Sequence, residues 1–168
     1  DMAMIAGVLV AAGAGIFFFF WTPSVTKYID INFTLSSNEI ASGDLVDVLV
    51  KTKNNSDKII ENAVLSISAP FGFIYTEIEP NVEYRKVEYR KANRPNFSLS
   101  IGVMDPGSEK EIKLKGYLFA DPEYPNDTNA RFDASLAYNQ KDNDADKIEV
   151  KRAVARFNVT RGALRITD

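Results

Sequence analysis

Residues 28–35, Tyr-Ile-Asp-Ile-Asn-Phe-Thr-Leu, decide the class of fold, because apolar and polar side chains alternate along them. Alternation with a period of two is typical of a β-strand that buries one face. Residues 46–51 repeat the pattern, with Val46, Val48 and Val50 on one side. Further runs of this kind are 63–68, 97–103, 112–118, 132–138 and 148–159. The last changes phase near Lys151 and Arg152, which predicts a bulge or a bend.

Turn-forming residues separate these runs. They are rich in Gly, Pro, Asn, Asp and Ser and lie at 42–44, 54–57, 105–107 and 142–144. The chain after residue 28 has no amphipathic helical pattern, and a single sheet would leave one apolar face uncovered. We therefore expect an all-β fold, an antiparallel β-sandwich over residues 28–161.

Several segments resemble the immunoglobulin-like repeat domains of prokaryotic surface proteins, including the CARDB-type modules. The shared features are a Gly-Asp strand start, an Asn-Asn-Ser turn, a strand ending in Pro-x-Gly-Phe and a later strand pair; here they occupy 39–50, 54–56, 63–73 and 104–114. The resemblance covers residues 28–160 and departs from the pattern at 74–95, which is longer and more charged. It implies an immunoglobulin-like extracellular module with a structural or adhesive role, and it brings no catalytic residues.

The N-terminal segment predicts a different environment. Met2 to Trp21 are twenty residues without a charge. As a helix they would be about 30 Å long, which matches the hydrocarbon core of a bilayer. Aromatic residues lie at one end, before Pro23. We expect a membrane-spanning or filament-core helix over 1–22, which contacts lipid or sister helices through residues 2–21, and a linker over 23–27.

Three alternatives to a membrane span remain open: a cleaved signal peptide, a buried soluble helix and a type IV pilin N-terminus. The fifth residue is Ile5, where such pilins usually carry an acid, and the flanking charges do not fix an orientation. Small residues recur every fourth position on one helix face, which is typical of helices that pack closely together. They are Ala3, Gly7, Ala11 and Gly15.

Composition narrows the function. The 168 residues contain no Cys and no His, and the net charge is −3. The chain therefore has no disulfide, no thiolate zinc site and no histidine base, and its charge argues against nucleic-acid binding. No phosphate-binding loop or nucleophile elbow occurs. We expect a protein that is not an enzyme and needs no cofactor.

The chain has five Asn-x-Ser/Thr sequons, which are candidate glycosylation sites. They are Asn32, Asn54, Asn96, Asn126 and Asn158. Asn54 and Asn126 are the preferred acceptors, because both lie in predicted loops. The alternative is that Asn, Ser and Thr favour turns and strand ends, which creates sequons without any modification.

Two further motifs suggest ligands. Val-Glu-Tyr-Arg-Lys occurs at 82–86 and again at 87–91, so Tyr84, Arg85, Tyr89 and Arg90 are candidates for a partner or glycan patch. A solvated hairpin with cross-strand charge pairs is the alternative.

Asp142, Asp144 and Asp146 have the alternate spacing of a calcium loop, but Lys147 and Ala153 stand where such loops carry Gly and Glu. A solvated acidic turn is the alternative.

The C-terminal part separates its charges. Residues 121–146 carry seven acids and two bases, whereas residues 147–168 carry six bases and two acids. These surfaces either meet between subunits or lie on neighbouring strands. Residues 162–168 alternate again and form an extension, the start of a further strand, or a strand added to a neighbour.

The sequence thus predicts a membrane-anchored surface protein in a homo- or hetero-oligomer. The alternatives are a filament subunit and an accessory ectodomain of a membrane complex.

Overall fold

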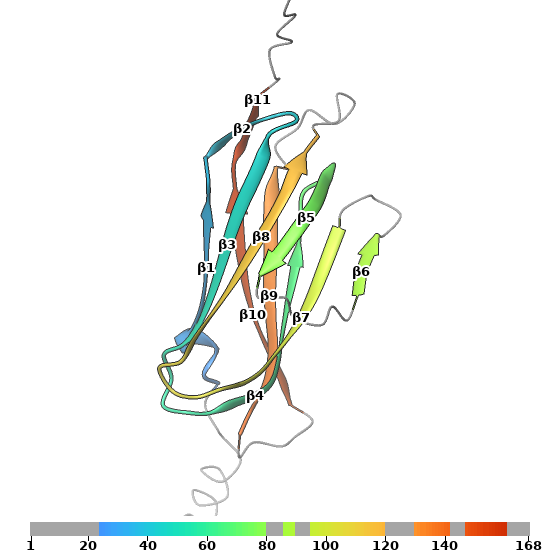
Figure 1. Cartoon of the computed structure of the whole chain (residues 1–168). Coiled ribbons are helices and arrows are strands. Elements are labelled where there is room, and N and C mark those ends of the chain that lie inside the picture. Colours follow the sequence, from blue (N-terminus) through green and yellow to red (C-terminus); the bar gives the residue numbers. More distant parts are fainter. Residues whose placement is uncertain (1–23, 80–85, 90–94, 120–129, 142–146, 161–168) are drawn as a thin grey trace, which may run out of the picture.

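The computed structural model describes residues 24–79, 95–119, 130–141 and 147–160, together with the backbone of 86–89. They form two facing β-sheets whose strands run along one long axis (Figure 1). The prediction of an all-β sandwich is confirmed.

The first sheet has four antiparallel strands and the second has five. The first sheet is ordered β1 (Ile29–Leu35), β3 (Leu45–Asn54), β8 (Glu109–Leu118), β5 (Phe73–Glu79). The second is ordered β10 (Ile148–Arg156), β9 (Arg131–Gln140), β4 (Ile60–Ser68), β7 (Pro95–Met104), β6 (Lys86–Tyr89). A separate parallel pair joins β2 (Glu39–Ala41) to β11 (Asn158–Thr160).

The strand order is that of a constant-type immunoglobulin domain. The sheet β1-β3-β8-β5 occupies the place of strands A, B, E and D, and β10-β9-β4 that of G, F and C. The strands β6 and β7 are an addition between β5 and β8, and they extend the second sheet beyond β4. The segment in which the sequence departs from the repeat pattern, 74–95, contains β6 of this addition and ends where β7 begins.

The core fills the space between the two sheets. Alternate residues of each long strand point inward, as the period of two requires, and the largest fully buried side chains include Tyr138, Phe97, Phe132, Leu65 and Met104. Phe73 packs edge-to-face on Phe132, with ring centroids 5.4 Å apart. The apolar rows that the sequence displays are therefore the two inner faces.

The turn before β5 explains the Pro-x-Gly-Phe motif. Gly72 has a φ of +77°, a conformation that other residues rarely adopt, and a Cβ there would collide with the carbonyl of Phe119. The turn delivers Phe73 into the core. Gly116 of β8 is its counterpart, because a Cβ there would lie 2.5 Å from the Ile74 carbonyl oxygen and 2.8 Å from the Tyr75 Cα.

Of the bulge or bend predicted near Lys151 and Arg152, the bulge is wrong. The pairing of β10 with β9 is continuous from Ile148 to Arg156. The strand keeps its phase by turning Glu149 inward and Val150 and Val154 outward, which the apolar pattern alone does not indicate. Irregular register occurs instead in β4, between Ile60 and Val64, and in β5, between Tyr75 and Glu77.

The described chain starts and finishes at opposite ends of the sandwich (Figure 1). The 3₁₀ turn η1 (Thr26–Tyr28) lies at the lower end of the view, and β2 and β11 lie at the upper end. Residues 24–27 of the predicted linker belong to the folded domain, since Val25 is buried in the core. The predicted helix over 1–22 and the extension over 162–168 lie outside the described residues.

Within the residues that the structure describes, no helix is long and apolar enough to cross a bilayer.

We expect Gly116→Ala to lower the free energy of unfolding by about 2–3 kcal/mol, because the added methyl must displace β5 backbone. Gly107→Ala is the matched control: its methyl meets no atom within 4 Å, and only the φ of +77° opposes it. The control should lose about 1 kcal/mol. Urea unfolding followed by far-UV circular dichroism measures the loss of unfolding free energy in both variants. Equal losses would contradict the packing assigned to Gly116.

Candidate functional site

A buried polar cluster ties the start of the domain to the second sheet. The carboxylate oxygen Oε2 of Glu149 lies 3.1 Å from the Tyr138 hydroxyl and 3.2 Å from the Thr26 hydroxyl, and both donate to it. Lys151 Nζ donates to the Thr26 carbonyl oxygen over 3.3 Å. We call Thr26, Tyr138, Glu149 and Lys151 the lower-end clamp. It joins residues more than 100 positions apart and fixes the path by which the chain reaches β1.

Burial sets the electrostatics of the clamp. Removal from water, reinforced by the negative charge of Glu149, raises the pKa of Tyr138 to about 12, against a partial lowering by the Thr26 hydrogen bond. Tyr138 is 1% exposed and Glu149 7%. The Oε1 atom of Glu149 is buried and has no hydrogen-bond partner among the described residues. The clamp therefore keeps a phenol protonated beside a buried carboxylate.

Asn54 closes the same end of the sandwich. Its Nδ2 donates to the carbonyl oxygens of Lys58, at 2.8 Å, and Met104, at 3.0 Å. Its Oδ1 accepts bonds from the Ser56 backbone N–H and hydroxyl. A single side chain thus joins the β3–β4 loop to the end of β7, with the donors and the acceptor of its amide all used.

The sequons fall in different environments. The prediction that Asn54 is an accessible acceptor is wrong, because its side chain is fully buried and its amide is bonded. Asn32 and Asn158 are exposed, and Asn96 is half-buried. Asn126 lies outside the described residues. Modification of the exposed sites remains a prediction.

The other candidate sites are not placed by the described part of the chain. Only the backbone of Tyr89 is described, in β6, while Tyr84, Arg85 and Arg90 lie outside. The triad Asp142, Asp144 and Asp146 and the helix positions Ala3, Gly7, Ala11 and Gly15 also lie outside. In the ranges that are described, no group of three or more His, Cys, Asp or Glu is placed to hold a metal ion.

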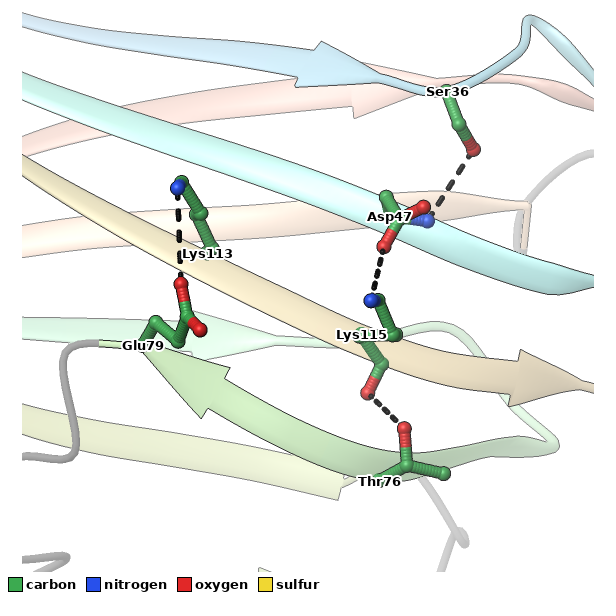
Figure 2. A network of polar contacts seen from close by, with 6 residues as sticks. All are labelled: Ser36, Asp47, Thr76, Glu79, Lys113 and Lys115. Atoms are coloured by element: carbon green, nitrogen blue, oxygen red, sulfur yellow. Dashed lines mark hydrogen bonds and ion pairs between the residues drawn. The ribbon is translucent and has the colours of Figure 1, made fainter.

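The outer face of the first sheet carries a ladder of charge pairs (Figure 2). Lys115 Nζ lies 3.6 Å from Asp47 Oδ1, and Lys113 Nζ lies 3.7 Å from Glu79 Oε2. The Asp47 backbone N–H also donates to the Ser36 hydroxyl, and the Thr76 hydroxyl donates to the Lys115 carbonyl. These exposed cross-strand pairs keep this face solvated and contribute little stability each.

A shallow hollow of about 410 Å³ lies over these pairs, lined in part by Thr34, Leu49, Glu77 and Lys113. Further along the same face, Lys51 lies 3.0 Å from Glu111, whose hydrogen bond and charge raise the pKa of Lys51. The groups of the hollow are mixed in sign and engaged with one another. The hollow therefore has the chemistry of a polar surface and does not single out one ligand class.

Solved structures of known proteins share the fold of this chain. The major pilin subunit BcpA of Bacillus cereus matches 80% of this chain and 41% of its own, with 12% identity and a TM-score of 0.52. A protein from Nocardia farcinica with an immunoglobulin-like fold matches 76% of this chain and 97% of its own, with 10% identity and a TM-score of 0.50. This is the fold of an immunoglobulin-like β-sandwich. At these identities the likeness concerns the fold alone.

Neither a scan against protein-family models nor a search of curated proteins found a match. The chain spans less than half of the pilin subunit that it resembles in fold.

Sequence reasoning missed the lower-end clamp. Its members are separated by up to 123 positions, so no local motif announces them. Alternation in the sequence gives the wrong side, because it turns apolar Ile148 and Val150 inward and Glu149 outward, whereas the structure buries Glu149 and pairs it with Tyr138. A buried carboxylate opposite a buried tyrosine indicates a polar contact at that end.

We predict that the immunoglobulin-like domain loses stability as the pH rises from 10 to 12. The unfolded chain releases the Tyr138 proton near its ordinary pKa of about 10, whereas the folded domain holds it to about 12. The raised folded pKa makes this contribution complete below pH 10 and lost above 12, with a magnitude of about 2 kcal/mol. Tyr138→Phe removes this contribution. The difference in unfolding free energy between the wild-type protein and Tyr138→Phe should therefore shrink between pH 10 and 12. Unfolding curves with parallel pH dependence would contradict the assignment.

We also predict that Asn54→Asp lowers the free energy of unfolding by about 3 kcal/mol, because an acceptor then faces the carbonyls of Lys58 and Met104. Asn38→Asp is the control, since it makes the same chemical change at an exposed side chain. It should shift stability by less than about 0.5 kcal/mol. Chemical denaturation at pH 7 compares them, and similar losses at both positions would show that Asn54 has no special role.

Proposed function

We propose that the protein is a structural component of the cell surface, in which the uncharged N-terminal segment inserts in the membrane and presents the immunoglobulin-like domain outside. The path of the chain carries the proposal. Thr26 is held beside Glu149 at the lower end, and β10 and β11 continue from there to Thr160. At about 3.3 Å per residue these eleven steps span roughly 36 Å. The described domain therefore extends lengthwise from Thr26 at its lower end to Thr160 at its upper end.

The clamp supports such a role. An anchored domain needs a fixed connection to its anchor, and residues 24–28 are held by Val25 in the core and by the Thr26 contacts to β9 and β10. A force or tilt at residue 24 passes directly into the second sheet. The charged outer face of the first sheet suits a domain that stands in water.

Membrane flotation of the full chain tests the proposal. We expect the full chain to float with vesicles and to leave them only with detergent, and residues 24–168 to remain soluble with a strand-rich far-UV spectrum. Val8→Arg/Val10→Arg is the matched variant: two charges within the uncharged segment oppose insertion and leave the domain untouched.

A full chain that stays soluble without detergent would contradict the proposal, as would a truncated chain that still floats. Filaments released by shearing and visible by negative-stain microscopy would favour a filament subunit instead. Stable co-purification with unrelated chains would favour an accessory subunit of a membrane complex.

A further inference from the structure

The first and last parts of the described domain run in the same direction. Residues 24–41, which we call the first segment, contain η1, β1 and β2, and residues 147–160, which we call the last segment, contain β10 and β11. Both begin at the lower end of the sandwich and finish at the upper end, where β2 and β11 lie (Figure 1). β1 lies against β10, and β2 pairs with β11 in the parallel sense.

The lower-end clamp ties the two segments together where both begin. The Thr26 hydroxyl donates to Glu149 over 3.2 Å, and the Thr26 carbonyl oxygen accepts a bond from Lys151 over 3.3 Å. Val25, beside them, is buried in the core. A pull on residue 24 therefore meets side-chain bonds to the last segment and a buried apolar side chain before it reaches β1.

The pair β2–β11 ties the same two segments at the upper end. The Asn158 backbone N–H donates to the Asn38 carbonyl oxygen over 2.8 Å, and the Ser42 backbone N–H donates to the Thr160 carbonyl oxygen over 3.1 Å. Backbone bonds therefore flank the paired residues on both sides. Ile40, at the centre of β2, is buried and holds this strand on the core.

We infer that the domain is a mechanical link, which resists a pull applied to the chain between its lower and upper ends. Such a pull draws the first segment downward from residue 24 and the last segment upward from residue 160. The two segments must then slide past each other along their own axes. Backbone bonds between strands lie largely across this direction, so the bonds of one ladder share the load and do not break one after another.

Neither segment can leave the domain without breaking both ties. Removal of the first segment strips all seven residues of β1 from β3, and removal of the last strips all nine residues of β10 from β9. Either route also breaks the lower-end clamp and the β2–β11 pair. A slide of one residue, about 3.3 Å, breaks the register of a ladder. The barrier to unfolding is therefore crossed within a short extension, which requires a high force.

The resistance follows from the described domain, whereas its use in the cell rests on the proposed function. A chain whose N-terminal segment is held in the membrane receives a pull on its far end through residue 24. That pull acts along the first and last segments. The inference thus adds a property to a structural surface component, namely that it keeps its fold while it transmits tension between the membrane and whatever is attached beyond it.

Unfolding of the full chain in detergent by optical tweezers tests the inference, with handles on two introduced cysteines, because the protein has no cysteine of its own. Lys27→Cys/Thr160→Cys attaches the handles at exposed positions and pulls along the segments. Lys53→Cys/Glu109→Cys is the matched control, because these paired neighbours of β3 and β8 are pulled apart across the sheet. At one loading rate we expect an unfolding force at least about twofold higher along the segments.

Asn158→Pro tests the tie at the upper end, because proline has no N–H to donate to Asn38. We expect this variant to lower the force along the segments by at least about a third and to leave the force across the sheet within about a tenth of its original value. A strand-rich far-UV spectrum without load checks that the variant is folded. If it is not folded, the comparison of the two directions in the original sequence decides.

Equal forces in the two directions would overturn the inference, as would a folded Asn158→Pro variant that resists the pull along the segments as well as the original chain does. Flotation of the same chains reads membrane association separately. A chain that resists this pull but does not float retains the inference and refutes the proposed function. A chain that floats but unfolds at equal forces does the reverse.

Discussion

The side chain of Asn54 is the contact on which the lower end of the sandwich depends. A β-sandwich is closed along its sides by hydrogen-bonded strands, but its ends expose backbone groups at every loop. Asn54 satisfies two carbonyls from different segments and receives two donors from Ser56. Its own backbone also bonds Ser108 and Gly107 in the β7–β8 loop. The single residue Asn54 therefore links the lower ends of the two sheets.

The lower-end clamp completes this closure on the side where the chain arrives. Thr26, Tyr138 and Glu149 bring polar groups into a region that the aliphatic core cannot fill, because the chain must pass there to reach β1. Together with the parallel pairing of β2 and β11 at the upper end, these contacts fix both points at which the chain leaves the sandwich. The result is a domain whose two connections lie along one axis.

Most of this fold follows from the sequence, because alternation with a period of two is a direct record of which side chains face the core. The strands β1, β3, β4, β7, β8 and β9 coincide with alternating runs. The pattern failed at β10, where apolar Val150 and Val154 face outward and small Ala153 and Ala155 face inward, so that hydrophobicity no longer indicates burial. The short pair β2–β11 has three residues per strand, too few for a periodic signal.

The candidate site was harder to predict than the fold. Asn54 has the sequence context of an exposed turn, and its burial depends on Met104, fifty positions away. The same distance in sequence hides the contacts of Glu149 with Thr26. Such tertiary polar contacts leave no local pattern, whereas the apolar rows of strands do.

The described chain begins at the lower end of the sandwich, where Thr26 is held, and finishes at the upper end, where β11 pairs with β2. The most direct measurement is pulsed electron spin resonance on the double variant Lys27→Cys/Thr160→Cys, in which the labels attach only at those two exposed positions. The account predicts one narrow distance distribution centred at about 35–40 Å, the length of β10 and β11 taken together. A broad distribution, or a mean distance below about 20 Å, would contradict it.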